Sequence, residues 1–440
     1  MRSRVAALLL SCGALLSSTH ASATPATPTG GDEPFVALLT FTPGEHPFAL
    51  FGHTALWVHD PRQPHAEDID LAYNYGTFDF GSPTVVPRFL SGRLSYWLSI
   101  ASLDWTLSTY GSEKRGITAQ ILNLDPTVRD DLIRKLSFNA QPEHRSYRYD
   151  FVRDNCSTRV RDMVDIALAG RLRAATQSRP ASTWRQQILR MASRDPLTYI
   201  GLDLALSAEA DQPITAWDEA FLPDRLHDEI TRLATKEPSL VDREVGLLSG
   251  GTPAPSAAPS WLSSYVLTGL VGSFLVLGFA YTRRAKRLAQ IALGLTTTAL
   301  GAFAGASGFA MLWFWIGTNV RITHHNENLL LMLPWSLGLI PVGLTIARGR
   351  PRFRAFAKLI ASSLVVSSTL LALIKLTPFS TQQNHGQIAL WLPVWYALAI
   401  ALRHVHFVGE AGAPGAGGLA SLAPDAGGGG ALRSGGGGPP

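Results

Sequence analysis

The sequence predicts two domains of different fold class, an α+β domain outside the membrane and an all-α domain of five transmembrane helices. Residues 32–248 mix charged, aromatic and apolar residues, with short apolar runs typical of strands. Residues 261–403 hold five long apolar segments, most of them near the roughly 20 residues that a helix needs to cross a bilayer. A linker rich in Gly, Pro, Ser and Ala, residues 249–260, separates the two domains.

The N-terminus predicts export. Arg2 and Arg4 precede the apolar run Val5–Leu16, and Ala21-Ser22-Ala23 fits a signal-peptide cleavage site. We therefore expect residues 1–23 to be a signal peptide, since the apolar run is short for an uncleaved membrane anchor. Leu9-Leu10-Ser11-Cys12 loosely resembles a lipoprotein signal, but the apolar run continues past Cys12, which favours ordinary cleavage.

Five spans are predicted in the membrane domain: Trp261–Tyr281, Leu288–Gly317, Asn328–Ile346, Phe356–Leu376 and Gln387–Leu402. The second span is long and rich in Gly, Ala and Thr. Its pair Gly301 and Gly305 has the small-xxx-small spacing that favours close helix packing.

The distribution of basic residues predicts the topology. They gather after the first, third and fifth spans: Arg283, Arg284, Lys286, Arg287, Arg348, Arg350, Arg352, Arg354, Lys358 and Arg403. By the positive-inside rule these loops are cytoplasmic, so the α+β domain faces the periplasm of a bacterial inner-membrane protein. The Gly/Pro/Ala-rich tail, residues 409–440, is then cytoplasmic and disordered. These anchors largely explain the net charge of +5, which therefore does not indicate nucleic-acid binding.

The sequence of the α+β domain predicts the order of its strands and helices. Predicted strands come first, a helix interrupts them, and a short strand leads into a second helix near Cys156. The predicted strands are Phe35–Phe41, His53–Val58, Ile69–Tyr75, Thr118–Leu124 and Tyr147–Phe151, and the helices cover Thr127–Phe138 and Val160–Leu168.

Cys156 is the most informative residue. The chain has 2 Cys, and removal of the signal peptide leaves Cys156 without a disulfide partner. A single thiol in an exported protein is either a buried apolar residue or a nucleophile. Asp154 and Asn155 are suited to cap a helix at Cys156, and the positive end of that helix would favour the thiolate. Nearby arginines, Arg153, Arg159 and Arg161, add positive charge.

A cysteine nucleophile needs a base and often a residue that orients the base. The candidate bases are His46, His53, His59, His65, His144 and His227. His53 is favoured because it opens a predicted strand, which would hold its imidazole rigidly. Alone, it would more often be a polar strand-end residue. Asn74 is the first candidate to orient it and Asp79 the second.

Other polar residues are candidates for substrate binding. Arg115 and Arg159 would bind an anionic group, although surface charges are usually only solvated. His324 and Asn328, in the loop before the third span, would complete a lipid headgroup site or merely cap the helix. The histidines show no recognised zinc spacing, and no nucleotide-binding motif is present, so we expect neither a metal nor a cofactor.

Taken together, these motifs resemble the Lnb family, which is linked to bacterial lipoprotein N-acylation. The matching segments are Phe51-Gly52-His53-Thr54, Asn74-Tyr75-Gly76-Thr77-Phe78, Tyr149-Asp150-Phe151, Asp154-Asn155-Cys156-Ser157-Thr158-Arg159, Phe221-Leu222-Pro223 and His324 to Leu330. The order of His53 before Cys156 also resembles circularly permuted papain-like enzymes of the NlpC/P60 group.

The resemblance implies a Cys156 nucleophile at a helix N-terminus, packed against a sheet that carries His53. It implies an acyltransferase that moves an acyl chain from a membrane phospholipid to the N-terminal amine of a diacylglyceryl lipoprotein. Three alternatives stay open: a cell-wall peptidase or amidase of the NlpC/P60 type, a non-catalytic lipid-binding or envelope-assembly protein, and a phospholipase that passes the acyl group only to water.

Overall fold

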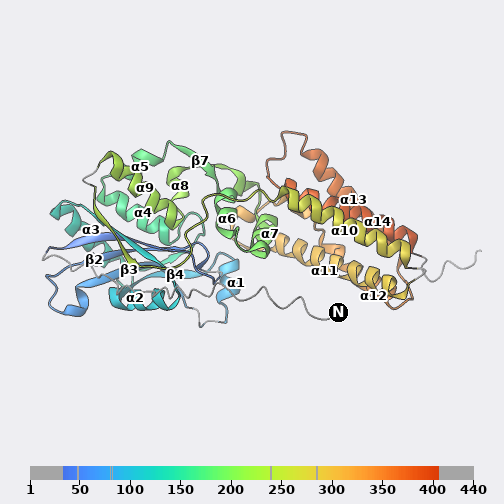
Figure 1. The fold of residues 1–440 in the computed structure, drawn as a ribbon, viewed down its shortest axis with the longest axis horizontal. Helices are drawn as coiled ribbons and strands as arrows, with labels where there is room; N and C mark the ends of the chain where they lie inside the picture. Colours follow the sequence, from blue (N-terminus) through green and yellow to red (C-terminus); the bar gives the residue numbers. More distant parts are fainter. Residues whose placement is uncertain are drawn as a thin grey trace, which may run out of the picture.

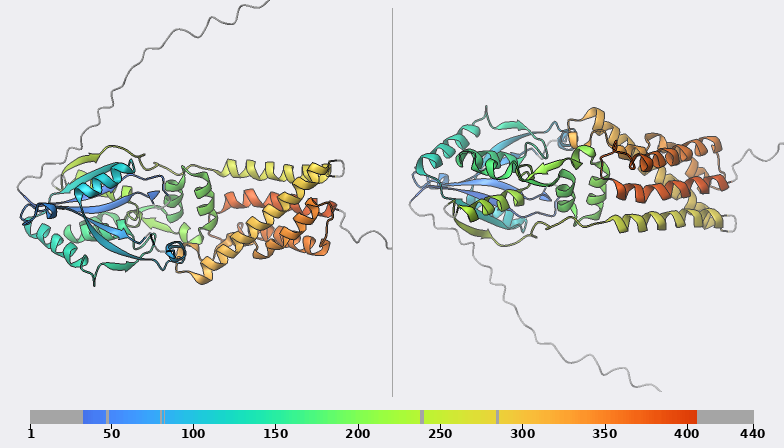
Figure 2. Two further views of the ribbon diagram at one scale, coloured as in Figure 1. Left: turned by 90° about the horizontal axis from the view of Figure 1, so that it is seen from below. Right: turned by 90° about the horizontal axis from the view of Figure 1, so that it is seen from above.

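The computed structural model describes residues 33–46, 49–79, 81, 83–237, 240–283 and 286–405. The predicted signal peptide, Cys12 and the predicted tail 409–440 lie outside the described residues. A domain built on a β-sheet occupies one end of the molecule and a bundle of long helices the other (Figures 1 and 2). The predicted order of an α+β domain followed by a helical domain is therefore confirmed.

The sheet has seven antiparallel strands in the order β6-β4-β3-β2-β1-β5-β9. The first strand has the predicted bounds, whereas β4 and β9 were not predicted. The strands are β1 Phe35–Phe41, β2 His53–His59, β3 Asp70–Thr77, β4 Ser95–Ser102, β5 Ile117–Leu122, β6 Ser146–Arg148 and β9 Val241–Leu248.

Both faces of the sheet are covered, because its strands alternate apolar residues between them. Val36 and Leu38 of β1 face one core, and Ala37 and Leu39 face the other. The first face packs against α3 (Pro126–Asn139), α4 (Cys156–Ala167) and α9 (Pro223–Lys236), and the second against α2 (Leu103–Ser112) (Figure 1).

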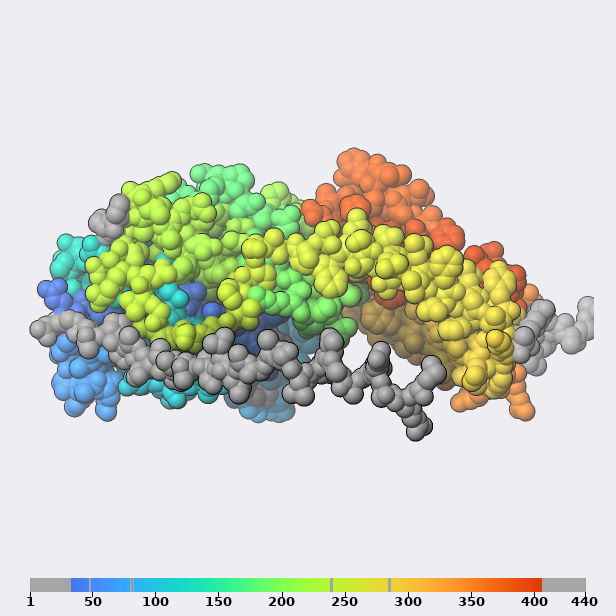
Figure 3. All heavy atoms as spheres, viewed as in Figure 1, coloured from blue at the N-terminus to red at the C-terminus, as the bar shows by residue number. Residues whose placement is uncertain are grey.

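Short elements connect the sheet to the bundle. In Figure 3 the green atoms of this part fill the space between the sheet domain and the yellow to red helices. They include α6 (Trp184–Ala192) and α7 (Pro196–Ala205). The remaining short elements of the described chain are η2 (Ala66–Asp68), which packs on β3, and α1 (Val85–Leu90), α5 (Arg171–Thr176), β7 (Pro180–Thr183), η3 (Ala208–Asp211), β8 (Pro213–Thr215) and α8 (Ala216–Glu219).

Four helices in the described part of the chain are long and apolar enough to cross a membrane. They are α10 (Leu262–Thr282), α11 (Arg287–Gly317), α13 (Arg354–Ile374) and α14 (His385–His404). The third predicted span is not a continuous helix. It consists of the 3-10 turns η5 (Glu327–Leu330) and η6 (Pro334–Gly338), followed by the short helix α12 (Leu339–Ala347), and a further 3-10 turn, η4 (Arg321–Thr323), precedes it. The segment Arg321–Leu330 meets Pro334–Ala347 at a bend of 53°.

Proline explains this break. Pro334 and Pro341 lack the amide hydrogen that a helix interior needs, and α12 accommodates Pro341 in its first turn. The carbonyls left over bond to neighbouring helices: the Trp395 Nε1–H donates to Leu331 O (3.0 Å), and Ser367 Oγ donates to Leu330 O (2.6 Å). Irregular backbone among membrane helices is thus buried in protein and hydrogen bonded.

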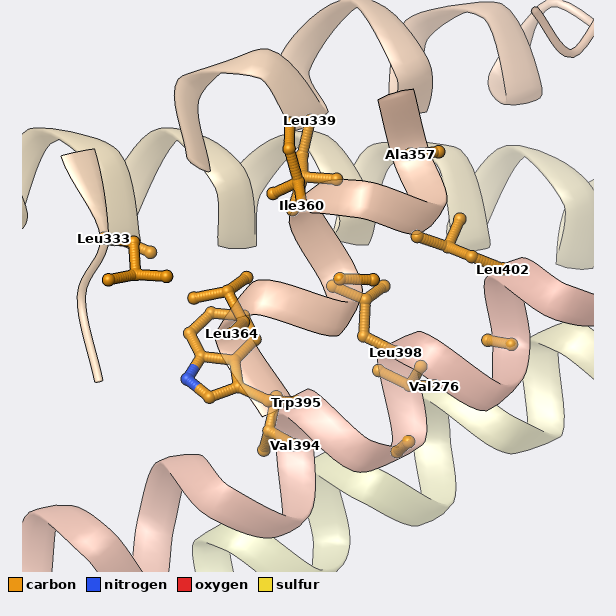
Figure 4. Packing of buried hydrophobic residues seen from close by; sticks show 14 of the residues in the cluster. Val276, Leu333, Leu339, Ala357, Ile360, Leu364, Val394, Trp395, Leu398 and Leu402 are labelled. Atoms are coloured by element: carbon orange, nitrogen blue, oxygen red, sulfur yellow. The ribbon is translucent and has the colours of Figure 1, made fainter. Parts of the chain in front are cut away.

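The glycines of α11 allow this segment to approach closely. A Cβ at Gly308 would lie 2.2 Å from Met332 O, and one at Gly301 would lie 2.6 Å from Leu339 Cβ. Gly305 packs similarly against Leu337. The predicted small-residue packing is therefore present, although its partner is a broken segment. Apolar side chains of α10, α11, α12, α13 and α14 form the core of the bundle, part of which is drawn in Figure 4.

A buried polar network joins the two domains. Asp203 of α7 accepts hydrogen bonds from Arg185 Nη1, Tyr265 Oη of α10 and Gln387 Nε2 of α14, all at 2.9 Å. Arg185 also pairs with Asp211 at 2.7 Å. Since every member is buried and bonded, the network fixes the sheet domain on the bundle.

The linker after β9 is also held in place. Arg190 Nη1 donates to Pro255 O (2.5 Å), and Arg194 Nη2 donates to Pro253 O (2.7 Å). At the opposite end of the bundle, Arg287 packs against Gly349, which brings together the loops after α10 and α12. Several of the basic residues used for the topology prediction therefore share the end far from the sheet domain.

Candidate active site

Asn155 fixes the start of α4 at Cys156. Its Oδ1 accepts from Thr158 N (2.9 Å), and Thr158 Oγ1 accepts from Asn155 N (2.8 Å), which makes a capping box. Its Nδ2 donates to Phe151 O (2.8 Å) and Phe221 O (3.0 Å). The predicted cap is therefore confirmed, and it also ties the helix start to two neighbouring segments.

Cys156 lies half-buried against the sheet. The backbone N–H groups of Thr54, Ser157 and Cys156 itself donate toward its sulfur and favour the thiolate. Burial outweighs them and raises the pKa of the thiol to about 11. The start of α4 therefore favours the thiolate, as expected, but desolvation of the sulfur outweighs this contribution, and no sequence pattern indicated it.

Gly76 makes room for the thiol. Its φ of +95° is unfavourable for a residue with a side chain. A Cβ there would lie 3.3 Å from Cys156 Cβ. The functional position of Gly76 could have been predicted from the sequence, since a glycine inside a strand often marks a close contact.

His53 begins β2 and contacts Asn74 on the adjacent strand β3. Its Nε2 lies 3.4 Å from Asn74 Oδ1, and Asn74 Nδ2 donates to Ala72 O (3.2 Å), which orients the amide. Because Oδ1 can only accept, this network assigns the hydrogen to Nε2 and leaves the lone pair on Nδ1. Phe41 packs beside the ring at 5.3 Å between centroids.

The imidazole of His53 is neutral at ordinary pH. Burial and, to a smaller extent, the positive charge of Arg115 lower its pKa to about 4, and the bond to Asn74 opposes this shift. Together with the high pKa of Cys156, this means that the site rests as a neutral thiol and a neutral base.

Cys156 and His53 line one cavity of about 650 Å³. No hydrogen bond joins the two side chains within the part of the chain that the structure describes, but the Thr54 N–H next to His53 points at the sulfur. A nucleophile and its base are often this loosely arranged before substrate binds. We call this the apolar cavity, since its lining includes Phe51, Phe89, Phe151, Leu202 and Phe221.

The apolar cavity reaches the membrane bundle. Phe314 of α11 and residues 319–323 line its far end. Helix α1 forms another wall, and the Asn319 N–H donates to Ser91 O (3.1 Å), which holds that wall against the end of α11. Trp313 and Trp315 are exposed next to Phe314, as is typical of residues at a membrane surface. The cavity therefore runs from the thiol to the end of α11, one of the helices that are long and apolar enough to cross a membrane.

A second cavity, of about 660 Å³, lies beyond His53 on the side of α2. We call it the polar cavity. Gly52, His53, Gly76 and Phe78 border both cavities. Its other lining residues are mostly polar and include Glu45, Asn74, Ser99, Thr109, Glu113 and Arg115.

The two predicted anion-binding arginines differ in position. Arg115 lies in the wall of the polar cavity, where Nε donates to Thr42 O (2.8 Å) and Nη1 contacts Glu113 (3.3 Å). Arg159 is not among the residues that line either cavity. It binds Asp154 through two bonds of 2.5 and 2.7 Å, and its guanidinium lies 4.3 Å from the centre of the Tyr147 ring.

The polar loop before the third span is largely structural. Asn328 is fully buried, donates to Leu204 O (2.9 Å) and accepts from Asn384 Nδ2 (2.7 Å). His324 adjoins residues 319–323 of the apolar cavity without lining it. These contacts bring Asn328 into the domain interface, away from Cys156.

Comparison with known families supports this reading of the fold. Residues 32–190 match the family model of the Lnb N-terminal periplasmic domain. The N-terminal domain belongs to the Lnb family. The matched Lnb segment contains His53, Asn74, Arg115 and Cys156, and it ends in α6. No curated protein and no solved structure gave a significant match to the chain.

Proposed function

We propose that this protein is a membrane-bound thiol acyltransferase. In this proposal an acyl chain passes from a phospholipid, through a thioester on Cys156, to the N-terminal amine of a diacylglyceryl lipoprotein. The observation that carries it is the apolar cavity, which leads from Cys156 to the end of α11. Family membership supports a lipoprotein as the acceptor.

The first step forms the acyl-enzyme. The Cys156 sulfur attacks the ester carbonyl of the phospholipid as its proton passes to His53 Nδ1. The C–O bond to the glycerol then breaks, and the imidazolium returns the proton to the leaving oxygen, so lysophospholipid departs as an alcohol. Because thiol and imidazole both start neutral, proton transfer accompanies attack and no stable ion pair precedes it.

The second step transfers the chain to nitrogen. The neutral α-amine attacks the thioester carbonyl, the C–S bond breaks, and His53 carries a proton from nitrogen to sulfur. In both steps the carbonyl oxygen becomes negative. The N–H groups of Cys156 and Ser157 at the start of α4, which donate to the sulfur in the resting site, would stabilise this oxygen once the sulfur is bonded to carbon. Asn74 orients the base.

The arrangement of the site also favours a circularly permuted papain-like fold, with His53 on a strand that precedes the Cys156 helix. The bundle is proposed to cross the inner membrane five times, with the bent segment as the third crossing. With five crossings and the sheet domain in the periplasm, the C-terminus would lie in the cytoplasm.

Two other functions agree less well with the site. A cell-wall peptidase needs a polar groove for glycan or peptide, whereas Cys156 faces a cavity lined by Phe and Leu. A purely structural lipid-binding protein would not need Asn74 to orient His53 beside a half-buried thiol.

The experiment is acyl-enzyme detection with full-length protein in phospholipid vesicles. Intact mass spectrometry should show one added acyl chain, removed by neutral hydroxylamine, with release of lysophospholipid. Cys156→Ala should abolish both signals, and His53→Ala should slow them by about 100-fold or more. His65→Ala is the matched control, because His65 is exposed outside both cavities. No adduct on well-folded wild-type protein would refute the thioester route.

A further inference from the structure

The polar cavity has no role in holding an acyl chain. It lies on the far side of His53 from the apolar cavity, and polar side chains form most of its lining. The wall shared by the two cavities includes Gly52 and Gly76, which place no side chains between them. Their φ angles of +77° and +95° favour glycine, so residues with side chains are disfavoured at both positions in this wall.

The charge at this cavity suits a cation. Glu45 and Glu113 are exposed lining residues, and the only buried cation among the described lining residues, Arg115, is already paired with Glu113. The acceptor of the second step arrives as an ammonium group. Carboxylates at the entrance would attract it, and the neutral His53 at the shared wall would not repel it.

Geometry sets the direction of approach. Once the acyl chain fills the apolar cavity, a nucleophile has to reach the thioester from another side. The polar cavity borders the same His53, and Trp105, 60% exposed in its lining, offers a flat surface for a peptide backbone.

We propose that the polar cavity is the acceptor site, which binds the N-terminal residues of the lipoprotein and delivers the α-amine past His53 to the thioester. This inference rests on the function proposed above. The entering ammonium releases one proton to water, and its second proton passes through His53 to the departing sulfur. Donor and acceptor thus use different cavities on the two sides of one base.

The test separates the two half-reactions in proteoliposomes, with labelled phospholipid as donor and a synthetic diacylglyceryl-cysteinyl peptide as acceptor. Thr109→Trp fills the polar cavity from α2. It should leave acyl-enzyme formation within about 2-fold of wild type and lower transfer to the peptide by at least about 10-fold. Loss of both half-reactions in folded protein, or of neither, would overturn the inference.

A surface variant guards against misfolding. Glu45→Arg reverses one charge at the entrance and should raise the KM for the lipopeptide several-fold, without changing acyl-enzyme formation. Glu67→Arg makes the same charge change at an exposed site outside both cavities and should behave as wild type. Equal KM values for the two variants would contradict the acceptor site. Absence of any acyl-enzyme in wild type would instead count against the proposed function itself.

Discussion

His53 Nε2 lies 3.4 Å from Asn74 Oδ1, across the paired strands β2 and β3. The Asn74 amide is itself fixed by its bond to Ala72 O. The imidazole is therefore positioned from the sheet, and its Nδ1 lone pair is left for chemistry.

Asn74→Ala should slow acyl-enzyme formation by about 10- to 100-fold, because the imidazole loses its orienting partner but remains a base. Single-turnover mass spectrometry measures the rate. Asn139→Ala, which removes an amide bonded to Tyr75 Oη outside the lining of both cavities, is the control and should change little. A wild-type rate in Asn74→Ala would assign the orienting role elsewhere.

The protonation states predict an unusual pH dependence. With a pKa near 11, Cys156 has about 100-fold less thiolate at neutral pH than a thiol at its ordinary pKa of 9.0. Alkylation by iodoacetamide should therefore be slow at pH 7 and increase up to about pH 11. The same protein unfolded in detergent, where burial is lost, should titrate near 9. An alkylation pKa near 7 in the folded protein would contradict the neutral resting thiol.

Protonation of His53 sets the decrease in the rate of acyl-enzyme formation at acidic pH. Since burial lowers its pKa to about 4, the imidazole keeps its lone pair down to mildly acidic pH. Acyl-enzyme formation should be nearly constant between pH 5 and 9 and fall only as pH decreases through about 4. A midpoint near 6.5, the ordinary value for histidine, would mean that His53 is solvated in the working enzyme.

The apolar cavity predicts chain-length selectivity. Ala205, at the end of α7, lines it, so Ala205→Phe should shorten the space for the acyl chain. The rate with long-chain phospholipid should decrease by about 10-fold relative to a short-chain donor. Gly201→Phe adds the same side chain on the exposed face of α7, where nothing lies within 4 Å of a Cβ, and should keep the wild-type ratio. Equal selectivity in both variants would place the chain elsewhere.

The domain interface predicts a large stability effect. Asp203→Ala removes a buried carboxylate that binds Arg185, Tyr265 and Gln387, and should lower the free energy of unfolding by about 3–5 kcal/mol. Asp131→Ala breaks only an exposed pair with Arg134 and should cost about 0–1 kcal/mol. Thermal unfolding in detergent compares the two. If the two variants lost equal amounts of unfolding free energy, the buried network would not be what stabilises the domain interface.

Much of the sheet was predictable because its central strands are short apolar runs with local partners. The predicted bounds of β1 are confirmed, and those of β2 differ by one residue. β9 was missed because it is partly exposed and charged, and its partner β5 lies far away in sequence. The third span was predicted as one continuous helix from its apolar composition. Its prolines interrupt the helix, and the glycines of α11 allow the interrupted segment to pack closely.

At the site, the sequence predicted that Cys156 and His53 lie in one place, but it did not predict their pKa values. Local capping signals identified the helix start at Cys156, and the position of His53 at a strand end brought it to the same cavity. The pKa of the thiol depends on burial by residues from many segments, which no local pattern reveals. The interface role of Asn328 likewise depends on the backbone of α7, far away in sequence.

The most direct test of the central claim is mass spectrometry of a reporter lipoprotein's N-terminus, in cells depleted of their own N-acyltransferase. Wild-type protein should add one amide-linked acyl chain. At equal expression levels, Cys156→Ala should add none and His53→Ala should add at most a trace. If Cys156→Ala adds the chain as well as wild type, the thioester mechanism is wrong. If wild type adds none, lipoprotein N-acylation is not the function.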